Sequence, residues 1–450
     1  MIRRAVRFLD ERSGTAPFLR KALRYVFPDH WSFLLGEMAL YSFVLLVGTG
    51  IYLTLFFKPS LTTVHYHGPY APLQGREMSE AYKSTVDISL QVKAGLLIRQ
   101  THHWAADFFV AAIVLHLLRI FFTGAFRKPR DLTYYIGVTM LGVALLEGYL
   151  GYSMVDDLLS GMGLAIGYGV LMSIPFVGAN LAQLVWGDPY PGKHEFESRM
   201  YVFHILLLPI LIGTLLALHL ALVAARHHTQ FRSSRRATER KVVGMPTFPG
   251  YAPRTLGLMF AVFAVLFLLG GLVQINPIWQ WGPYHVSQAT NGAQPDWYLG
   301  WLIGALRLVP NFDVTIGHYT LVPNPFWGGA AFPMVVFGVL YLWPWLERRV
   351  TGDYAFHNLL DRPRDTPWRT AIGVAFFTWI FIVFVAGASD RLFVLFDLSY
   401  AGQIWVYRVL VWVLPVVALF LTRRICLELV RGERVERERR LAEAEAEALA

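Results

Sequence analysis

Histidine is the residue type whose spacing in this sequence points most directly to chemistry. His102 and His116 lie 14 residues apart in one long apolar stretch, and His204 and His219 lie 15 apart in another. On an α-helix, steps of about 100° and 1.5 Å per residue place each pair along one side, about 21 Å apart. In a membrane with a hydrocarbon core about 30 Å thick, one histidine of each pair would lie near each edge.

Two such helices facing each other would bring the histidines together in twos. His102 would meet His204 at one edge of the membrane, and His116 would meet His219 at the other. Two imidazoles can take both axial positions of a haem iron, and such a six-coordinate haem carries electrons rather than binding oxygen. A hydrogen-bonded place in a bundle is the commoner explanation for one histidine alone, but ionisable residues inside a membrane are functional by default. The spacing therefore predicts two haems stacked across the membrane.

Glycines at the same spacing support the haem interpretation. Gly36 and Gly50 are 14 residues apart, and so are Gly137 and Gly151. Each pair should face inward at two levels, where a missing side chain lets a flat macrocycle approach the helix backbone. Taken alone, each pair could equally serve the packing of small residues between membrane helices.

Arginines lie one helical turn from two of these histidines. Arg99 precedes His102 by three residues, and Arg119 follows His116 by three. Residues at this spacing are neighbours on a helix surface, and a guanidinium is well suited to bind a haem propionate. The alternative is that both arginines extend to the membrane surface.

Three further ionisable residues lie in the same apolar stretches. His103 is 13 residues from His116, about 220° around the helix, so we expect it to point away from the haems. Asp107 and Glu147 are acids at membrane depth, and Glu147 lies one turn before Gly151. A proton relay and hydrogen bonding within the bundle would each explain these two acids.

Eight apolar runs of membrane-spanning length must position these residues. Only 16% of the chain is charged, whereas about a quarter is usual in a soluble domain. Because backbone groups in lipid must pair internally, we predict an all-α integral membrane protein with an N-terminal four-helix haem bundle and a C-terminal four-helix segment. The runs cover about 33–57, 93–122, 134–155, 199–224, 255–275, 327–346, 370–388 and 402–422.

The charged segments between the runs indicate the topology. Lys and Arg are concentrated at both chain ends and in the loops of one side, so we expect both termini in the cytoplasm. Basic clusters beside membrane helices are typical of contact with lipid rather than nucleic acid. The one cysteine, Cys426, leaves no CxxCH motif for covalent haem, so the haems would be non-covalent. The predicted parts are an N-terminal segment (1–30), the haem bundle (31–230), a linker (231–254), the C-terminal segment (255–426) and a charged tail (427–450).

From about residue 30 to residue 426, the sequence resembles the cytochrome b family of cytochrome bc and bf complexes. The motifs that carry the resemblance are GEMALYSFVLLVGTG (36–50), RQTHHWAADFFVAAIVLHLLR (99–119), LGYSM (150–154), FHILLLPILIGTLLALH (203–219) and QPDWYLGWLIGALRLVPN (294–311). Details such as GYSMVDDLLSGMGL (151–164) and HNLLDRPRD (357–365) are most similar to the actinobacterial branch. One chain through eight runs favours the respiratory type over the photosynthetic bf type, in which the two halves are separate chains.

The resemblance implies roles for the histidines. His102 and His204 match the ligands of the low-potential haem b near the outer face. His116 and His219 match the ligands of the high-potential haem b near the cytoplasm.

The resemblance also marks a quinol-oxidation motif, formed by Pro295, Asp296, Trp297 and Tyr298. The family usually has Glu where this chain has Asp296. A carboxylate there can take a proton from a quinol hydroxyl, and Tyr298 can orient the quinol or a partner's histidine. Capping of a loop helix is the alternative role, since Asp is a good N-cap.

The family reaction requires partners and a second quinone site. One electron would pass to a Rieske iron–sulfur protein, and the other through both haems to an inner quinone site, for which His228 and Gln230 are candidates. The resemblance further implies a c-type cytochrome subunit, a homodimeric complex, a supercomplex with a terminal oxidase, a plasma-membrane location and, from the branch, menaquinol as substrate.

Two other functions stay open from the sequence alone. A proton-coupled transporter would explain the buried His, Asp and Glu residues but not their matched spacings. A haem-bearing membrane anchor of a dehydrogenase would be smaller and would need no motif like that at 295–298.

Overall fold

The computed structural model describes the chain except for residues 1–7, 9, 193–194, 233–235, 289–294 and 450. Within the described part, eight helices are long and apolar enough to cross a membrane, which confirms the predicted all-α membrane fold. Gln294, the first residue of the family motif at 294–311, lies outside the described residues, whereas the predicted quinol-oxidation residues 295–298 are described.

The spanning helices begin and end close to the predicted positions. Pro367 begins α15, where its missing N–H costs nothing, and Gly352, with φ +68°, follows the last residue of α14. The helices are α3 (Leu34–Thr54), α5 (Gly95–Phe122), α6 (Asp131–Ser153), the continuous α9 (Glu195–Val202), π-helical η3 (Phe203–Leu207) and α10 (Leu208–Arg226), α11 (Ala252–Leu272), α14 (Phe332–Thr351), α15 (Pro367–Gly387) and α17 (Tyr400–Leu449).

The last helix differs most from the prediction. The apolar run was expected to end near residue 422, but α17 continues through the charged tail to Leu449. Arg434 pairs with Glu438 at 2.9 Å and Arg439 with Glu443 at 2.8 Å, and pairs four residues apart stabilise an exposed helix. The charged tail is therefore helical and continuous with the spanning helix.

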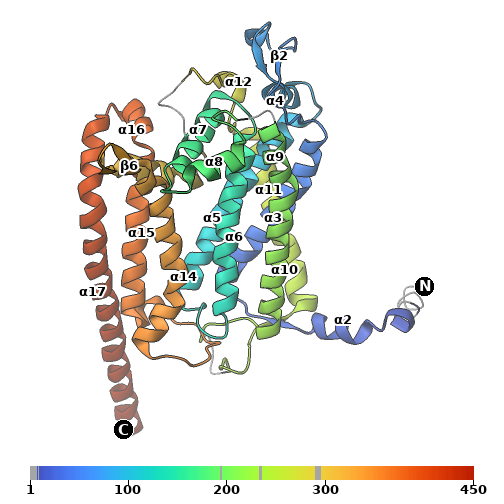
Figure 1. Cartoon of the computed structure of the whole chain (residues 1–450). Helices are drawn as coiled ribbons and strands as arrows, with labels where there is room; N and C mark the ends of the chain where they lie inside the picture. Colours follow the sequence, from blue (N-terminus) through green and yellow to red (C-terminus); the bar gives the residue numbers. More distant parts are fainter. Residues whose placement is uncertain (1–7, 9, 193–194, 233–235, 289–294, 450) are drawn as a thin grey trace.

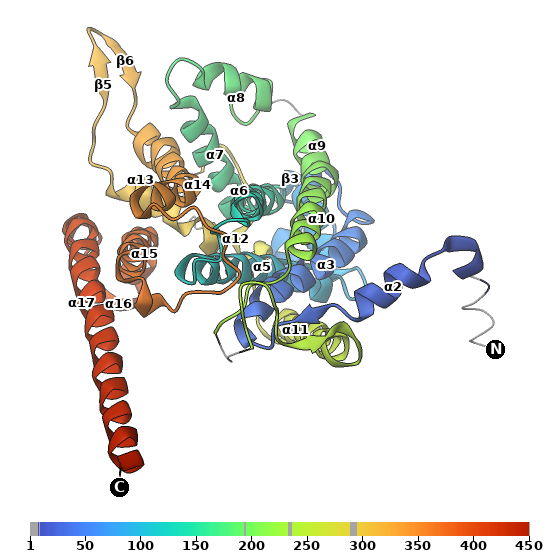
Figure 2. The same cartoon turned by 90° about the horizontal axis from the view of Figure 1, so that it is seen from below.

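Helices α3, α5, α6 and α10 surround a common core (Figures 1 and 2). Ala39, Phe109, Ala144 and Ile212, one from each helix, belong to a single buried cluster. The small alanines let the helices approach one another, which is how membrane helices pack without a hydrophobic driving force. This bundle, together with η3, which runs directly into α10, holds all four histidines of the spacing argument.

Helix α11 packs against α3 and α5, on the outside of this bundle. Its Val262 and Leu266 share a buried cluster with Leu45 and Ala105. The sequence places this helix in the C-terminal segment, whereas its packing joins it to the N-terminal bundle. The division of the chain into five parts stays a prediction.

A second group of helices consists of α13 (Gly300–Leu308), α14, α15 and α17. Ala305, Ile382, Ala386 and Val411 form its buried core. Helices α13 and α15 cross so closely at Gly304 that a Cβ there would lie 1.7 Å from the Val383 carbonyl oxygen, so only glycine fits.

Short elements cover the two ends of the helices (Figure 1). The end that carries the three long loops holds β2 (Thr63–His65) paired with β3 (Glu77–Ser79), η2 (Ala71–Leu73), α4 (Glu80–Leu90), α7 (Leu158–Met172), α8 (Gly178–Trp186), α12 (Ile278–Trp281), η5 (Trp297–Leu299), β5 (Val314–Ile316) paired with β6 (Tyr319–Val322), η6 (Trp327–Ala331) and α16 (Ser389–Phe396). The other end holds α2 (Ala16–Leu23), β1 (Val26–Phe27) paired with β4 (Met245–Pro246), η1 (Trp31–Phe33), η4 (Thr247–Tyr251) and η7 (Pro363–Asp365).

Candidate functional site

His102 and His204 lie side by side within the four-helix bundle. His102 lies in α5 and His204 in the π-helical turn η3, and their ring centroids are 6.3 Å apart with the planes at 79°. A metal ion bound at about 2 Å by each of two imidazoles holds the ring centroids roughly 6 Å apart. The spacing of this pair therefore fits one iron between the rings. We call this the outer level, and the level of His116 and His219 the inner level.

Hydrogen bonds hold one nitrogen of each outer histidine. Thr49 Oγ1 donates to the Leu45 carbonyl at 2.7 Å, so its lone pair accepts the Nδ1–H of His102 at 2.9 Å. His204 Nδ1 lies 3.2 Å from the Glu147 carbonyl oxygen and 3.0 Å from Glu147 Oε1. Ligand histidines typically donate their second ring N–H in this way, which leaves Nε2 free for the metal.

Each of the four predicted glycines faces a different one of the four histidines. A Cβ on Gly50 would lie 3.4 Å from His102 Cε1, and one on Gly151 would lie only 2.5 Å from His204 Cε1. At the inner level, a Cβ on Gly36 would lie 3.1 Å from His116 Cε1, and one on Gly137 would lie 3.7 Å from His219 Cε1. The glycines thus leave room for the imidazoles at both levels.

The inner level has fewer polar partners than the outer level. His116 and His219 are close enough to interact electrostatically. His116 Nδ1 is buried and has no hydrogen-bond partner among the described residues. Free ring nitrogens with a facing glycine suit this level for a second haem, but they do not fix the ring orientation as the outer hydrogen bonds do.

Arg99 and Arg119 carry buried N–H groups that the described residues leave unpaired. In Arg99 only Nη2 donates, to the Asn276 carbonyl at 3.2 Å, and Nε has no partner. In Arg119 both Nε and Nη2 lack partners, and the guanidinium lies 4.2 Å from the ring centre of Phe33. Because buried N–H groups are rarely left unpaired, an anionic group such as a haem propionate fits both sites.

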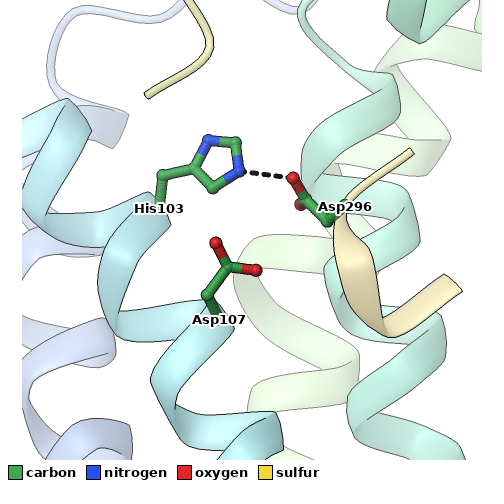
Figure 3. Close-up of side chains that lie close together, drawn as sticks. All are labelled: His103, Asp107 and Asp296. Carbon is green, nitrogen blue, oxygen red and sulfur yellow. Dashed lines mark hydrogen bonds and ion pairs between the residues drawn. The ribbon is translucent and has the colours of Figure 1, made fainter. Parts of the chain in front are cut away.

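Asp296 lies against α5, where it binds a histidine that was not predicted to have a role (Figure 3). His103 Nε2 lies 2.6 Å from Asp296 Oδ1, and Tyr298 donates its hydroxyl to Asp296 Oδ2 at 2.9 Å. Asp107 approaches the pair from the next turn of α5, and ligand atoms of His103, Asp107 and Asp296 all lie within 4.8 Å of one another. His103 points toward Asp296 of the quinol-site motif (Figure 3), and it also lines the cavity that His102 and His204 line. The sequence did contain one sign of this role: His103 and Asp107 are four residues apart in α5, so they lie on the same face of the helix.

Tyr298 is fixed in place by α6. A Cβ on Gly148 would lie 2.4 Å from the Tyr298 hydroxyl oxygen, so the ring occupies space that only glycine leaves open. Burial, followed by the charge of Asp296, raises the pKa of Tyr298 well above its usual value, so the hydroxyl remains a donor. Pro295 is partly buried, and Trp297 is 40% exposed, with its ring plane at 75° to that of Phe384.

One cavity joins the outer histidines to the Asp296 loop. Its volume is about 250 Å³, and its lining is mostly apolar. The polar lining includes His102, His204, Glu147, Asp296 and Tyr298. Gly50, Gly151 and Arg99 line it too, so a haem held by His102 and His204 would lie in this cavity, with Asp296 and Tyr298 lining the same cavity beside it.

The two candidates for an inner quinone site lie in different surroundings. His228 Nδ1 lies 3.1 Å from the Tyr25 hydroxyl, and its ring lies 4.9 Å from that of Phe27. Burial, together with Arg130 and Arg119, lowers the pKa of His228 to about 4. Gln230 is buried, and its amide binds Thr238, Lys241 and Val243. The structure therefore gives Gln230 a role in holding the linker loop.

Comparisons with known proteins extend the resemblance over nearly the whole chain. The family model described as Cytochrome b(N-terminal)/b6/petB matches residues 107–283. The cytochrome bc1 complex cytochrome b subunit of Streptomyces coelicolor is 46% identical over 431 residues, covering 96% of this chain and 78% of that protein. The subunit of the same name from Mycobacterium leprae is 48% identical over 427 residues, covering 95% of this chain and 77% of that protein.

A solved structure shares the fold. A chain described as belonging to a hyperthermophilic respiratory Complex III aligns over 93% of this chain and 98% of its own length, with a TM-score of 0.68 and 20% identity. The sequence similarity argues against a transporter or a dehydrogenase anchor and confirms the predicted family. This chain belongs to the cytochrome b subunits of cytochrome bc1 complexes.

Proposed function

We propose that this chain holds two b-type haems and oxidises a quinol, with menaquinol the expected substrate, as the cytochrome b subunit of a quinol–cytochrome c reductase. The observation that carries the proposal is the shared cavity, which is lined both by His102 and His204 and by Asp296 and Tyr298. Oxidation of a quinol releases electrons and protons together. A haem held by the two histidines would lie in this cavity, so a quinol bound beside the haem would have an electron acceptor and the Asp296 carboxylate within reach.

The proposed haem sites use the histidines, glycines and arginines at each level. His102 and His204 would hold the outer haem, with Gly50 and Gly151 facing their rings and Arg99 available for a propionate. His116 and His219 would hold the inner haem in the same way, with Gly36, Gly137 and Arg119. Bound between two histidines, a haem supplies one-electron transfer with no open position for oxygen.

The Asp296 carboxylate is oriented for proton transfer. Its two oxygens accept hydrogen bonds from His103 and Tyr298, and each oxygen keeps a second lone pair. That lone pair can accept the proton of a quinol hydroxyl bound next to the outer haem, as a general base. Ligand atoms of His103 and Asp107 lie within 4.8 Å of those of Asp296, so these two residues can share the transferred proton.

The partners follow from the family and complete the reaction. One electron would pass to a Rieske iron–sulfur protein and on to a c-type cytochrome subunit. The other would cross both haem levels to an inner quinone site, for which His228, beside Tyr25 and Phe27, is the remaining candidate. We place the complex in the plasma membrane as a homodimer, with both termini cytoplasmic, and a supercomplex with a terminal oxidase is compatible with this role.

Replacing Asp296 tests the proposed function. In Asp296→Asn the amide accepts a quinol proton poorly, so quinol oxidation should fall about 100-fold or more while haem content stays unchanged. Asp296→Glu keeps the carboxylate and should retain much of the activity. Asp188→Asn, at an exposed acid of the same end, is the matched control and should be neutral. Wild-type turnover in Asp296→Asn would refute the proposed role.

A further inference from the structure

Glu147 of α6 is the residue on which this inference rests. Its Oε1 lies 3.0 Å from Nδ1 of His204, and its own carbonyl oxygen lies 3.2 Å from the same nitrogen. Its second carboxylate oxygen, Oε2, is buried and has no hydrogen-bond partner among the described residues. The carboxylate therefore has one polar partner in the structure, and that partner is a candidate haem ligand.

The contact follows from how His204 packs on α6. Gly151 lies one helical turn after Glu147, and a Cβ there would lie 2.5 Å from His204 Cε1. The imidazole therefore rests directly on the backbone of α6, with its Nδ1 edge toward residue 147. Residues four apart lie on one helix face, so Gly151 and Glu147 both contact the imidazole ring of His204 from the same face of α6.

The other three candidate ligands lack a carboxylate of this kind. His102 donates to the neutral hydroxyl of Thr49. Nδ1 of His116 and Nδ1 of His219 are both buried and have no hydrogen-bond partner among the described residues. Within the described chain, the carboxylate contact belongs to one ligand of the outer level alone.

We propose that Glu147 is a positioning residue for the outer haem: it holds the His204 imidazole so that Nε2 faces the iron, and it lowers the midpoint potential of the outer haem relative to the inner one. This inference rests on the proposed di-haem function. A carboxylate that accepts the Nδ1–H fixes the tautomer and makes Nε2 a stronger donor to the metal. A stronger donor stabilises oxidised iron, and the effect is large where few polar groups screen it.

The expected consequence is a direction for electron transfer. With the lower potential at the outer level, electrons would move from the cavity side toward the inner level. The Thr49 hydroxyl, which also accepts a ligand N–H but carries no charge, should have a smaller effect on the same haem.

A potentiometric titration of the haem spectrum in the whole purified complex tests this proposal. Glu147→Gln keeps an oxygen that can accept the Nδ1–H but lacks the charge, so the midpoint of the outer component should shift upward while the inner midpoint stays unchanged. Thr49→Val is the comparison at the other ligand and should shift the outer midpoint by less. A change in the low-temperature spin-resonance signal of the outer haem alone should accompany the Glu147→Gln shift.

The outcomes separate this proposal from the proposed function. Two haems per chain with both midpoints unchanged, or with both shifted equally, would overturn the role of Glu147 and leave the di-haem assignment intact. If Glu147→Gln does not retain the outer haem, Glu147→Asp decides, because its shorter carboxylate weakens the bond: a small upward shift is expected, and an unchanged midpoint refutes the role. A wild-type chain without two haems would instead refute the proposed function.

Discussion

The outer and inner levels of the bundle share their histidine and glycine pattern but differ in charge. The outer level has three acids nearby, Glu147, Asp296 and Asp107, with Glu147 in contact with a ligand. Each level also has one buried arginine near its histidines, Arg99 at the outer level and Arg119 at the inner level, and the inner end adds Arg130 beside His228. Negative charge favours oxidised iron and positive charge favours reduced iron. Two levels with the same histidine ligands can therefore give haems of different midpoint potential, because the charges near the ligands differ.

The largest effect should come from removing one ligand at one level. His102→Leu should abolish the outer haem and leave the inner haem, so the haem content falls from two per chain to one. His116→Leu should do the reverse, and each variant is the control for the other. The measurement is the haem content per chain, together with the midpoint potential of the remaining haem. Loss of both haems from each single variant would show that the two levels are not separate sites.

The next largest effect should distinguish two glycines of α6, Gly151 and Gly137. A Cβ at Gly151 would overlap His204, whereas one at Gly137 would lie 3.7 Å from His219, at ordinary contact distance. Gly151→Ala should therefore cost about 1–3 kcal/mol through overpacking and lower the occupancy of the outer haem. Gly137→Ala should leave both haems and the thermal stability nearly unchanged. Equal losses in the two variants would argue against the difference in packing.

A smaller effect is expected in the pH dependence of stability, which should differ between the outer and inner ends of the molecule. Burial raises the pKa of Asp156, at the outer end, to about 7 from an ordinary value of 3.8. Its contribution to stability is therefore complete below about pH 3.8 and is lost as the pH rises through about 7. Asp156→Asn should raise the melting temperature at pH 8 by about 1–2 °C and should not change it at pH 4. The positive φ of 55° at this position suits asparagine as well as aspartate.

His228 at the inner end should show the opposite dependence. Burial lowers its pKa from 6.5 to about 4, so its contribution to stability is present above pH 6.5 and is lost as the pH falls through about 4. His228→Gln should therefore reduce the loss of melting temperature on acidification and leave the value at pH 8 nearly unchanged. A variant that lowers stability equally at both pH values would point to a packing role.

Helix periodicity explains why so much of the bundle could be predicted from the sequence. A helix converts sequence separation into angle and height, so 14 or 15 residues between His102 and His116 or between His204 and His219 specify two levels. The eight spans followed for a similar reason, since lipid requires long apolar helices.

Contacts between loops and helices could not be predicted in this way. The bond from His103 to Asp296 depends on where the loop before α13 lies, and that position is set by the fit of Tyr298 on Gly148. Gln230 resembled a site residue by its place after His219, yet its amide is used within its own loop. Neither contact leaves a periodic pattern in the sequence.

The central claim is that paired histidines hold one haem at each of two levels. A potentiometric titration of the wild-type complex, monitored by the reduced-minus-oxidised spectrum, tests this claim most directly. We predict two haem components of equal size with separate midpoints, the lower of which is absent from His102→Leu. A single component, or no haem at all, would contradict the account.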